Sequence, residues 1–207
     1  MIIGGTGLVG KELTTLLLAD ERYSKVVLLV RKPLATLHQK LVQVAYNFDH
    51  PDTSVVVADE LFSCLGTTIK DAGNKTAFYK VDHDYIVDTA KAGFKNGIKK
   101  FALVSSMGAD KKSRIFYNKT KGETEDAVST IGFEAIFIFR PSLLLGSRAN
   151  KRIGESIAQF LMSALAFAIP RKYKAIKGSQ VARAMVAVMN SDYEGVHIFE
   201  SDAIASL

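Results

Sequence analysis

The segment "IIGGTGLVG" at residues 2–10 decides the fold, because it places glycines at every third position after an apolar start. A helix-like segment follows directly. Between a strand and a helix, glycines let the backbone turn sharply and approach a pyrophosphate, while the first helical N–H groups face the phosphates. The segment therefore predicts a dinucleotide-binding loop, with a ligand-free glycine turn as the alternative. The residues expected to hold the dinucleotide are Gly4, Thr6, Gly7, Leu8, Val9 and Gly10.

Apolar runs of strand length alternate with helix-like segments along the rest of the chain. The expected strands are residues 25–30, 41–46, 55–59, 61–65, 101–106, 134–140 and 196–201, and the expected helices are residues 10–18, 80–96, 117–130 and 179–190. Residues 55–59 fit a short helix or loop as well as a strand. Continuous β-branched and aromatic runs are typical of strands covered on both faces. The alternation predicts an α/β fold with a doubly wound parallel sheet.

Length and composition fit a single domain over residues 1–207. The chain is 48% hydrophobic and 23% charged, which suffices for a substantial buried core. The apolar run at residues 157–169 is too short to span a bilayer and suits a buried or interfacial helix. Within it, Phe160, Leu161 and Phe167 fit either the cover of a pocket or the face of a homodimer.

Charge and cysteine content narrow the class of protein. The net charge of +6 is spread along the chain without a long basic run, which argues against a nucleic-acid partner. The lone Cys64 cannot form an internal disulfide or a cysteine-rich zinc site. No secretory signal precedes the glycine loop, so we expect a cytoplasmic protein. The first strand has only Ile2 and Ile3 between Met1 and the glycines, which is short for a central strand, so a truncated start is one interpretation.

The basic pair Arg31 and Lys32 indicates which dinucleotide is bound. It follows the strand at residues 25–30, where an NAD site usually carries Asp or Glu for the ribose 2′-hydroxyl. A basic residue suits a 2′-phosphate instead, so the sequence predicts NADP(H) in preference to NAD(H). A solvated basic loop is the alternative. Asp49, after the following strand, fits either a contact to the adenine amino group or an ordinary turn.

One tyrosine and one lysine have the spacing of a proton-transfer pair. Of the seven tyrosines, Tyr117 and Tyr173 have a lysine four residues later, and only Tyr117 comes after an apolar strand that ends in serine. An ammonium one helical turn away favours the phenolate and lowers its pKa from about 10. The spacing therefore predicts that Tyr117 is a general acid whose pKa is lowered by Lys121. The lysine can also bond the nicotinamide ribose. A surface tyrosine with a lysine neighbour is the alternative.

Two serines at the end of the strand at residues 101–106 complete this arrangement. Either Ser105 or Ser106 can bond the substrate oxygen and stabilise the charge that forms on it. Strand alternation predicts that only one of them faces the site.

The glycine loop, the serine and the Tyr-x-x-x-Lys spacing together resemble the short-chain dehydrogenase/reductase superfamily. The stretches "FSCLGTTIKDAG", "AFYKVDHDY", "SSMGADKKSRIFYNKTKGETE" and "FRPSLLLGSR" are similar to the atypical members grouped with the Tat-interacting-protein oxidoreductases. This resemblance covers nearly the whole chain and implies a Rossmann fold that binds NADPH. It also implies cofactor contacts from the "CLGTT" loop, through Leu65, Gly66 and Thr67.

Residues 141–207 are expected to form a small substrate-side cap, since they are too few for the large substrate domain of sugar-nucleotide epimerases. Pro141 and Ser142 fit the lining of the nicotinamide side or ordinary strand-end packing. In "VDHDY", His83 stands between Asp82 and Asp84, but helical neighbours diverge around the axis. We therefore expect a solvated helix start there and no metal site.

The predicted function is an NADPH-dependent oxidoreductase of the short-chain dehydrogenase type, acting on a small carbonyl or hydroxyl substrate. An enzyme like the nucleoside-diphosphate-sugar epimerases is one alternative, because such a reaction includes a transient hydride transfer. A regulatory protein that senses NADPH and binds a protein partner without turnover is the other, since a fold alone does not prove catalysis.

Overall fold

A computed structural model describes residues 1–145 and 170–207 of the chain. The apolar run at residues 157–169, with Phe160, Leu161 and Phe167, lies outside the described residues. The main sheet has seven strands in the order β3-β2-β1-β4-β5-β6-β9, and all neighbouring strands are parallel. Its strands are β1 (Ile2–Ile3), β2 (Val26–Val30), β3 (Leu41–Ala45), β4 (Glu60–Ser63), β5 (Lys100–Val104), β6 (Ala135–Arg140) and β9 (Gly195–Glu200).

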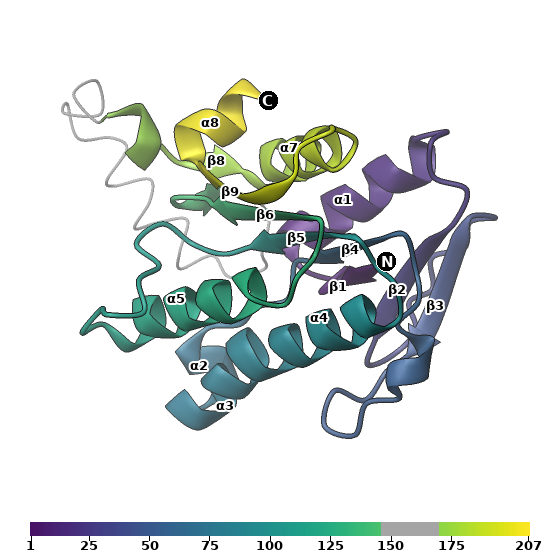
Figure 1. Cartoon of the computed structure of the whole chain (residues 1–207), viewed down its shortest axis with the longest axis horizontal. Coiled ribbons are helices and arrows are strands. Elements are labelled where there is room, and N and C mark those ends of the chain that lie inside the picture. Colours follow the sequence, from purple (N-terminus) through teal and green to yellow (C-terminus); the bar gives the residue numbers. More distant parts are fainter. Residues whose placement is uncertain (146–169) are drawn as a thin grey trace.

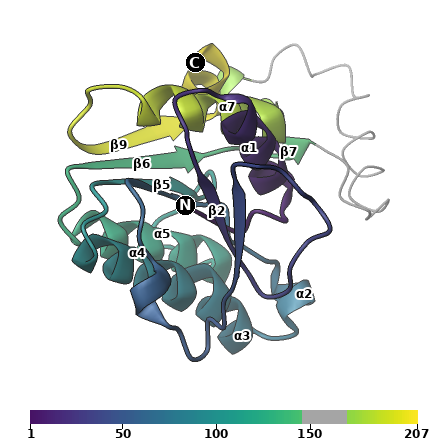
Figure 2. The same ribbon diagram turned by 90° about the vertical axis from the view of Figure 1, so that its right-hand side faces the viewer.

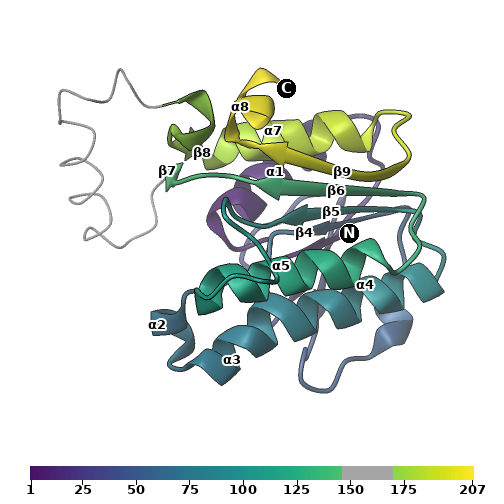
Figure 3. The same ribbon diagram turned by 60° about the vertical axis from the view of Figure 1, so that its left-hand side comes forward.

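Helices cover the sheet on both faces, which confirms the predicted doubly wound α/β fold. Figure 1 shows α1 (Leu8–Ala19) and α7 (Gly178–Met189) on one side, with α4 (Tyr85–Lys95) and α5 (Phe116–Ser129) on the other. Figures 2 and 3 show the same two helical layers from other directions. The short elements are α2 (Ile69–Ala72), α3 (Lys75–Tyr79), α8 (Ser201–Ser206), the 3-10 turns η1 (Thr53–Val55) and η3 (Arg171–Tyr173), the π-helical turn η2 (Lys80–Asp84), and the paired strands β7 (Leu144–Leu145) and β8 (Ile176–Lys177).

Successive residues of the central strands enter opposite cores. Ile2 belongs to the cluster under α1 and α7, whereas Ile3 belongs to the cluster under α4 and α5. Leu28 and Leu29 divide in the same way. Because a strand turns alternate side chains to opposite faces, such strands need apolar residues at every position. Burial of both faces of the strands therefore explains why the apolar runs in the sequence are continuous.

The strand order reverses between β1 and β4, which is where doubly wound sheets bind nucleotides. At this point Gly4 has φ of +74°, and a Cβ there would lie 2.4 Å from the backbone of Cys64 and Leu65. Gly10 is equally confined, because its Cβ would lie 2.2 Å from the Gly4 carbonyl oxygen. The glycine spacing is therefore a packing requirement of the turn itself.

The strand expected at residues 55–59 is wrong, and the alternative of a short helix or loop is confirmed. The carboxylate of Asp52 accepts the Ser54 N–H at 3.0 Å and starts the 3-10 turn η1 instead. The side-chain amide of Asn96 then donates to the carbonyls of Thr53 and Val56, at 2.7 and 3.1 Å. These bonds satisfy backbone groups that a strand would have paired, so the chain passes beneath α4 without joining the sheet.

Two predicted boundaries also change. The strand expected to run to Ser106 ends at Val104, so both serines follow it and strand alternation does not choose between them. The helix expected over residues 80–96 extends back through the π-helical turn η2 to Lys75, where the Asn74 side chain caps the Ala77 N–H. The longer helix and its wide turn alter which residues face inward.

Residues 141–207 contribute to the main layers as well as to their end. β9 pairs with β6 in the sheet, and α7 packs beside α1. The division into a body and a substrate-side cap stays a prediction. No helix within the described ranges is long and apolar enough to cross a membrane.

We predict that Gly10→Ala destabilises the fold despite the better helix propensity of alanine. The Cβ clash with the Gly4 carbonyl should lower the free energy of unfolding by about 3 kcal/mol, which lowers Tm by roughly 6–12 °C. Gly7→Ala is the matched control, because its Cβ would lie 3.3 Å from the same oxygen. Thermal melts compare the two, and a Gly10→Ala protein as stable as Gly7→Ala would contradict the packing argument.

Candidate functional site

The loops at the carboxyl edge of the sheet bring most of the predicted residues together. The Cys64 N–H donates to the Ile3 carbonyl at 2.9 Å, which sets the loop after β4 beside the glycine loop. The Met107 N–H donates to the Pro141 carbonyl at 2.9 Å, which joins the segments after β5 and β6. Parallel strands end at one edge, so residues distant in sequence meet there.

The glycine loop has the features of an anion site. The Gly7 N–H donates to the Gly4 carbonyl at 3.0 Å and closes the turn. α1 begins at Leu8 without a side-chain cap, and its first turn carries no acidic residue. The free N–H groups and the positive end of the helix dipole therefore face outward from the turn. Together with the tight turn that needs Gly4 and Gly10, these residues fit the pyrophosphate of a dinucleotide.

The other predicted loop residues differ in exposure. Thr6 is exposed and Leu8 is half-buried, so both can contact a ligand through their side chains. Val9 is buried in the core beneath α1, which leaves only its backbone to contribute.

A buried ion pair lies beneath the loop that follows β4. Lys121 of α5 places its ammonium nitrogen 2.7 Å from Oδ1 of Asp82, and the two side chains are 6% and 0% exposed. The other oxygen, Oδ2, accepts the Thr67 N–H at 2.8 Å. A Cβ on Gly66 would lie 3.3 Å from Oδ1 and 3.6 Å from the lysine nitrogen. Because Gly66 has no side chain, the loop contacts the ion pair directly at this residue.

The π-helical turn η2 places Asp82. In such a turn the helix widens and offers backbone carbonyls to other partners, and these turns are frequent at functional sites. Here the Asp82 carbonyl accepts the Thr124 hydroxyl from α5 at 2.8 Å. The expectation of a solvated helix start is wrong at this residue, because neighbours that diverge around a helix axis can still send one side chain inward.

Lys121 keeps its charge although it is buried. Desolvation alone would lower the pKa of its ammonium, but the charges of Asp82, Tyr117 and Glu125 more than offset this and raise the pKa above its ordinary value. The lysine is therefore an ammonium at neutral pH.

Tyr117 lies one turn before Lys121 on the same helix and is half-buried. Its ring packs against Phe78, with the ring centroids 5.4 Å apart. The loop after β5 reaches the same helical turn, because the Asp110 N–H donates to the Asn118 carbonyl at 3.0 Å. The tyrosine is thus held between α3 and the loop that begins with the two serines.

The hydroxyls of Ser105 and Ser106 are both buried, and neither has a hydrogen-bond partner within the described part of the chain. A buried hydroxyl without a partner lowers stability, so such groups usually have a functional explanation. Both serines can therefore serve a ligand oxygen.

The predicted adenosine-side residues form a looser cluster. Arg31 and Lys32 are exposed directly after β2. Asp49 pairs with Lys80 and accepts the Tyr85 hydroxyl, so its carboxylate is already engaged. Burial and Asp49 raise the pKa of the Tyr85 phenol, whereas the nearby charges of Lys80 and Arg31 oppose this rise.

At the other end of the site, Pro141 is buried and Ser142 is bound to the C-terminal segment. The Ser142 N–H donates to the Ser201 hydroxyl at 2.7 Å, and the Ser142 hydroxyl donates to the Lys174 carbonyl. These contacts fit strand-end packing. The described residues contain no group of three metal-ligating side chains.

A second buried ion pair anchors α5, and sequence reasoning missed it. Glu125, one turn after Lys121, accepts two bonds from the Arg140 Nε, at 3.0 and 3.2 Å, and pairs with its terminal nitrogen. The bond to Glu125 raises the pKa of Arg140. α5 is therefore fixed to η2 through Lys121 and to the end of β6 through Glu125.

Comparison with known proteins assigns the chain to a family. A family model described as NAD(P)H-binding matches residues 4–192. The chain belongs to the NAD(P)H-binding family. Rat (Rattus norvegicus) HTATIP2 is 34% identical over 213 residues, which cover 100% of this chain and 87% of that protein. FMP52, mitochondrial, of Eremothecium gossypii is 33% identical over 215 residues, covering 100% and 96%. The resemblance to the Tat-interacting-protein oxidoreductases is thus confirmed.

Solved structures of similar fold confirm the Rossmann architecture. MoeE5 in complex with UDP-glucose and NAD aligns with a TM-score of 0.73 and 14% identity, over 99% of this chain and 79% of that one. UDP-N-acetylglucosamine 4-epimerase from Methanobrevibacter ruminantium M1 aligns with a TM-score of 0.72 and 17% identity, over 96% and 75%. At these identities the likeness shows the fold alone.

The names of the relatives correct the expected location. Several relatives, from Eremothecium gossypii, Coccidioides immitis and Candida albicans among others, carry the word mitochondrial in their names. The cytoplasmic expectation is therefore wrong. It rested on the lone Cys64 and on the missing secretory signal, and both features suit more than one reducing compartment.

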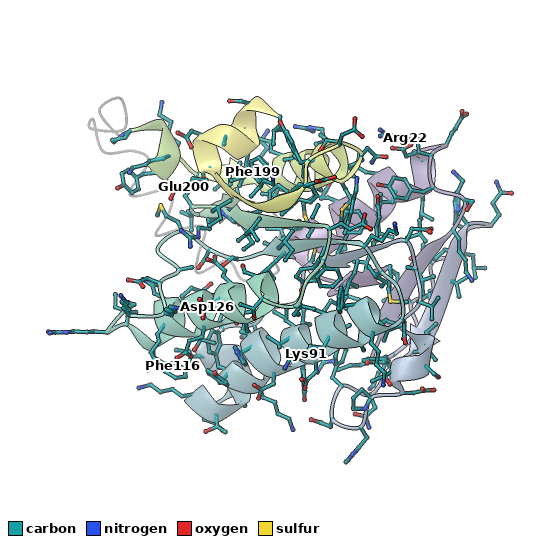
Figure 4. The ribbon with its side chains drawn as sticks, viewed as in Figure 1. Arg22, Lys91, Phe116, Asp126, Phe199 and Glu200 are labelled. Atoms are coloured by element: carbon teal, nitrogen blue, oxygen red, sulfur yellow. The ribbon has the colours of Figure 1, made fainter. Side chains whose placement is uncertain are left out.

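We predict that Glu125→Gln destabilises the protein far more than Asp126→Asn on the same helix. The first change leaves Arg140 without its buried partner, which should cost about 3 kcal/mol and lower Tm by roughly 6–12 °C. Asp126, labelled in Figure 4, pairs with Lys111 at the surface, where both side chains are about half exposed. That pair should contribute less than about 1 kcal/mol. Equal melting temperatures of the two variants would contradict the buried anchor.

Proposed function

We propose that this protein is an NADP(H)-dependent oxidoreductase of the short-chain dehydrogenase type that interconverts a small carbonyl and the corresponding alcohol. The observation that carries the proposal is the charged, buried Lys121, which lies one helical turn from Tyr117 and beneath the Gly66–Thr67 loop. The proposal treats residues 1–207 as one NAD(P)-binding unit, with residues 141–207 on the substrate side. The relatives' names support a mitochondrial location for it.

The proposed roles follow from the chemistry of each side chain. Bound NADPH supplies the hydride. Tyr117 gives its phenolic proton to the carbonyl oxygen as that oxygen gains negative charge, and it takes the proton back in the reverse direction. Lys121 stabilises the phenolate and bonds the ribose. The hydroxyls of Ser105 and Ser106 donate to the substrate oxygen and hold it beside the phenol.

The preference for NADPH rests on Arg31 and Lys32, which are exposed at the end of β2. A guanidinium presents paired donors that match a phosphate, and the end of the second strand is where the adenosine ribose of a doubly wound fold lies. The carboxylate of Asp49 is engaged by Lys80 and Tyr85, so it does not compete for Arg31.

An epimerase-like reaction is the second candidate. The structures of similar fold include sugar-nucleotide epimerases and a dehydratase, several of them with NAD. Such a reaction uses the same tyrosine but returns the hydride to the substrate, so it consumes no cofactor. Steady NADPH oxidation with a panel of small carbonyls would favour the oxidoreductase, whereas turnover of a nucleotide sugar without net oxidation would favour the epimerase.

We predict that Tyr117→Phe abolishes most turnover and leaves NADPH binding intact. The change removes one oxygen and keeps the ring packing on Phe78, so turnover should fall by about 10²–10⁴-fold. Lys121→Met should lower both turnover and cofactor affinity, because it removes the charge and the ribose contact. Fluorescence titration and carbonyl reduction measure the two effects.

Tyr173→Phe is the matched control for this series. Tyr173 has a lysine at the same spacing but is 48% exposed and lies in the short 3-10 turn η3, whereas Tyr117 lies in the long helix α5. It should leave both measurements unchanged. If Tyr117→Phe keeps wild-type turnover while NADPH still binds, Tyr117 is not the proton donor and the proposed roles fail.

We predict that Arg31→Ala separates the two nicotinamide cofactors. A lost charged hydrogen bond should weaken NADPH binding by about 10- to 150-fold, while NADH binding should hardly change. Arg183→Ala, at an exposed position of α7, is the control for loss of one positive charge. Titrations of both cofactors test this, and equal losses for NADPH and NADH would remove Arg31 from the site.

A further inference from the structure

Asp82 links three separate elements through one residue. Its Oδ1 lies 2.7 Å from the Lys121 ammonium, and its Oδ2 accepts the Thr67 N–H at 2.8 Å. Its carbonyl accepts the Thr124 hydroxyl at 2.8 Å. The side chain is fully buried, so bulk solvent does not compete for these bonds. A shift of the carboxylate would therefore move both the lysine and the loop after β4.

The balance of charge around Lys121 depends on Asp82. Burying an ammonium costs several kcal/mol unless an anion lies beside it. The ionisable groups that face the lysine are Asp82 from η2, together with Tyr117 and Glu125 from its own helix. Glu125 is already paired with Arg140 of β6. Among the described residues, Asp82 is thus the one carboxylate whose partner is Lys121.

We propose that Asp82 is a positioning residue of this site, which holds Lys121 as an ammonium and fixes it beneath the Gly66–Thr67 loop. The inference rests on the proposed function, because it assigns Lys121 to the cofactor ribose and to Tyr117. Asp82 acts through Lys121 and through the Thr67 N–H, and it takes no part in proton transfer itself.

The variant Asp82→Asn removes the charge and keeps the shape. Its amide oxygen can still accept the Thr67 N–H. Lys121 then becomes a buried ammonium without its carboxylate, so its pKa falls below that of the unfolded chain. The lysine should therefore lose its proton at a lower pH than in the wild type, where the Asp82 carboxylate keeps it charged.

Cofactor affinity against pH provides the first test. We expect the Kd for NADPH to be nearly constant from pH 7 to 9.5 in the wild type. In Asp82→Asn it should rise by about tenfold or more over the same range as Lys121 loses its charge. In Asp82→Asn/Lys121→Met, where no lysine titrates, the Kd should again be constant. Asp126→Asn, an exposed Asp-to-Asn change on α5, should match the wild type.

Turnover separates positioning from a purely structural role. In Asp82→Asn, kcat should fall progressively relative to the wild type as the pH rises, because the neutral lysine no longer stabilises the phenolate. If Asp82 only capped the Thr67 N–H, the Kd and kcat of Asp82→Asn would follow the wild-type pH dependence with a constant offset. That parallel behaviour would overturn the proposal.

Thermal stability tests the same residue without any cofactor. Since the pKa of Lys121 in folded Asp82→Asn lies below its unfolded value, the unfolded chain binds more protons between the two, and stability there rises with pH. The wild type has the opposite shift, so its stability does not rise with pH through this group. The gap in Tm between the two proteins should therefore be largest near pH 7 and narrow towards pH 10. A gap that is constant with pH would contradict the proposal.

These experiments distinguish a failure of the proposed function from a failure of the role proposed for Asp82. If the wild type binds no nicotinamide cofactor, the proposed function fails, while the melting experiment still tests whether Asp82 holds Lys121 as an ammonium. If Asp82→Asn does not fold, the comparison is between Lys121→Met and the double variant at pH 7. Removing the stranded Asp82 charge should then raise Tm, and an unchanged or lower Tm would overturn the proposal.

Discussion

A buried ammonium needs a negative partner, and the partner of Lys121 is Asp82. This ion pair joins α5, the π-helical turn η2 and the loop after β4, which come from three separate parts of the chain. Because both charges are shielded from water, neither side chain can move far without a large electrostatic cost. The pair therefore fixes the lysine in place, and the tyrosine one turn earlier on the same helix shares that rigidity.

A second constraint operates at the point where the strand order reverses. The segment after β4 approaches the glycine turn so closely that Gly4 has no room for a Cβ, and the Gly4 carbonyl leaves none at Gly10. The uncapped N-terminus of α1 follows this turn, and Gly66 covers the ion pair in the loop after the neighbouring strand β4. An anion-binding turn and a fixed cation thus lie along one edge of the sheet, which is the arrangement that a dinucleotide with a reactive end requires.

Much of this architecture can be read from the sequence, because the signals are local. The glycine spacing, the apolar strands and the Tyr117–Lys121 turn each depend on neighbours within a few residues. Asp82 was missed because a carboxylate is expected in solvent and its buried partner Lys121 is distant in sequence, although its place four residues after Phe78 and four before Ile86 was a signal of burial. The strand at residues 55–59 failed because Asn96, some 40 residues later, bonds its backbone. Contacts between distant segments decided both cases.

The central claim is that the Lys121–Asp82 pair and the glycine turn together form one cofactor site. A crystal structure with bound NADP⁺ tests it most directly. We expect the pyrophosphate on the N–H groups at the start of α1, a hydroxyl of the nicotinamide ribose within hydrogen-bond distance of Lys121, and Asp82 still paired with that lysine. A cofactor bound elsewhere, or a Lys121 side chain turned away from the ribose, would contradict it.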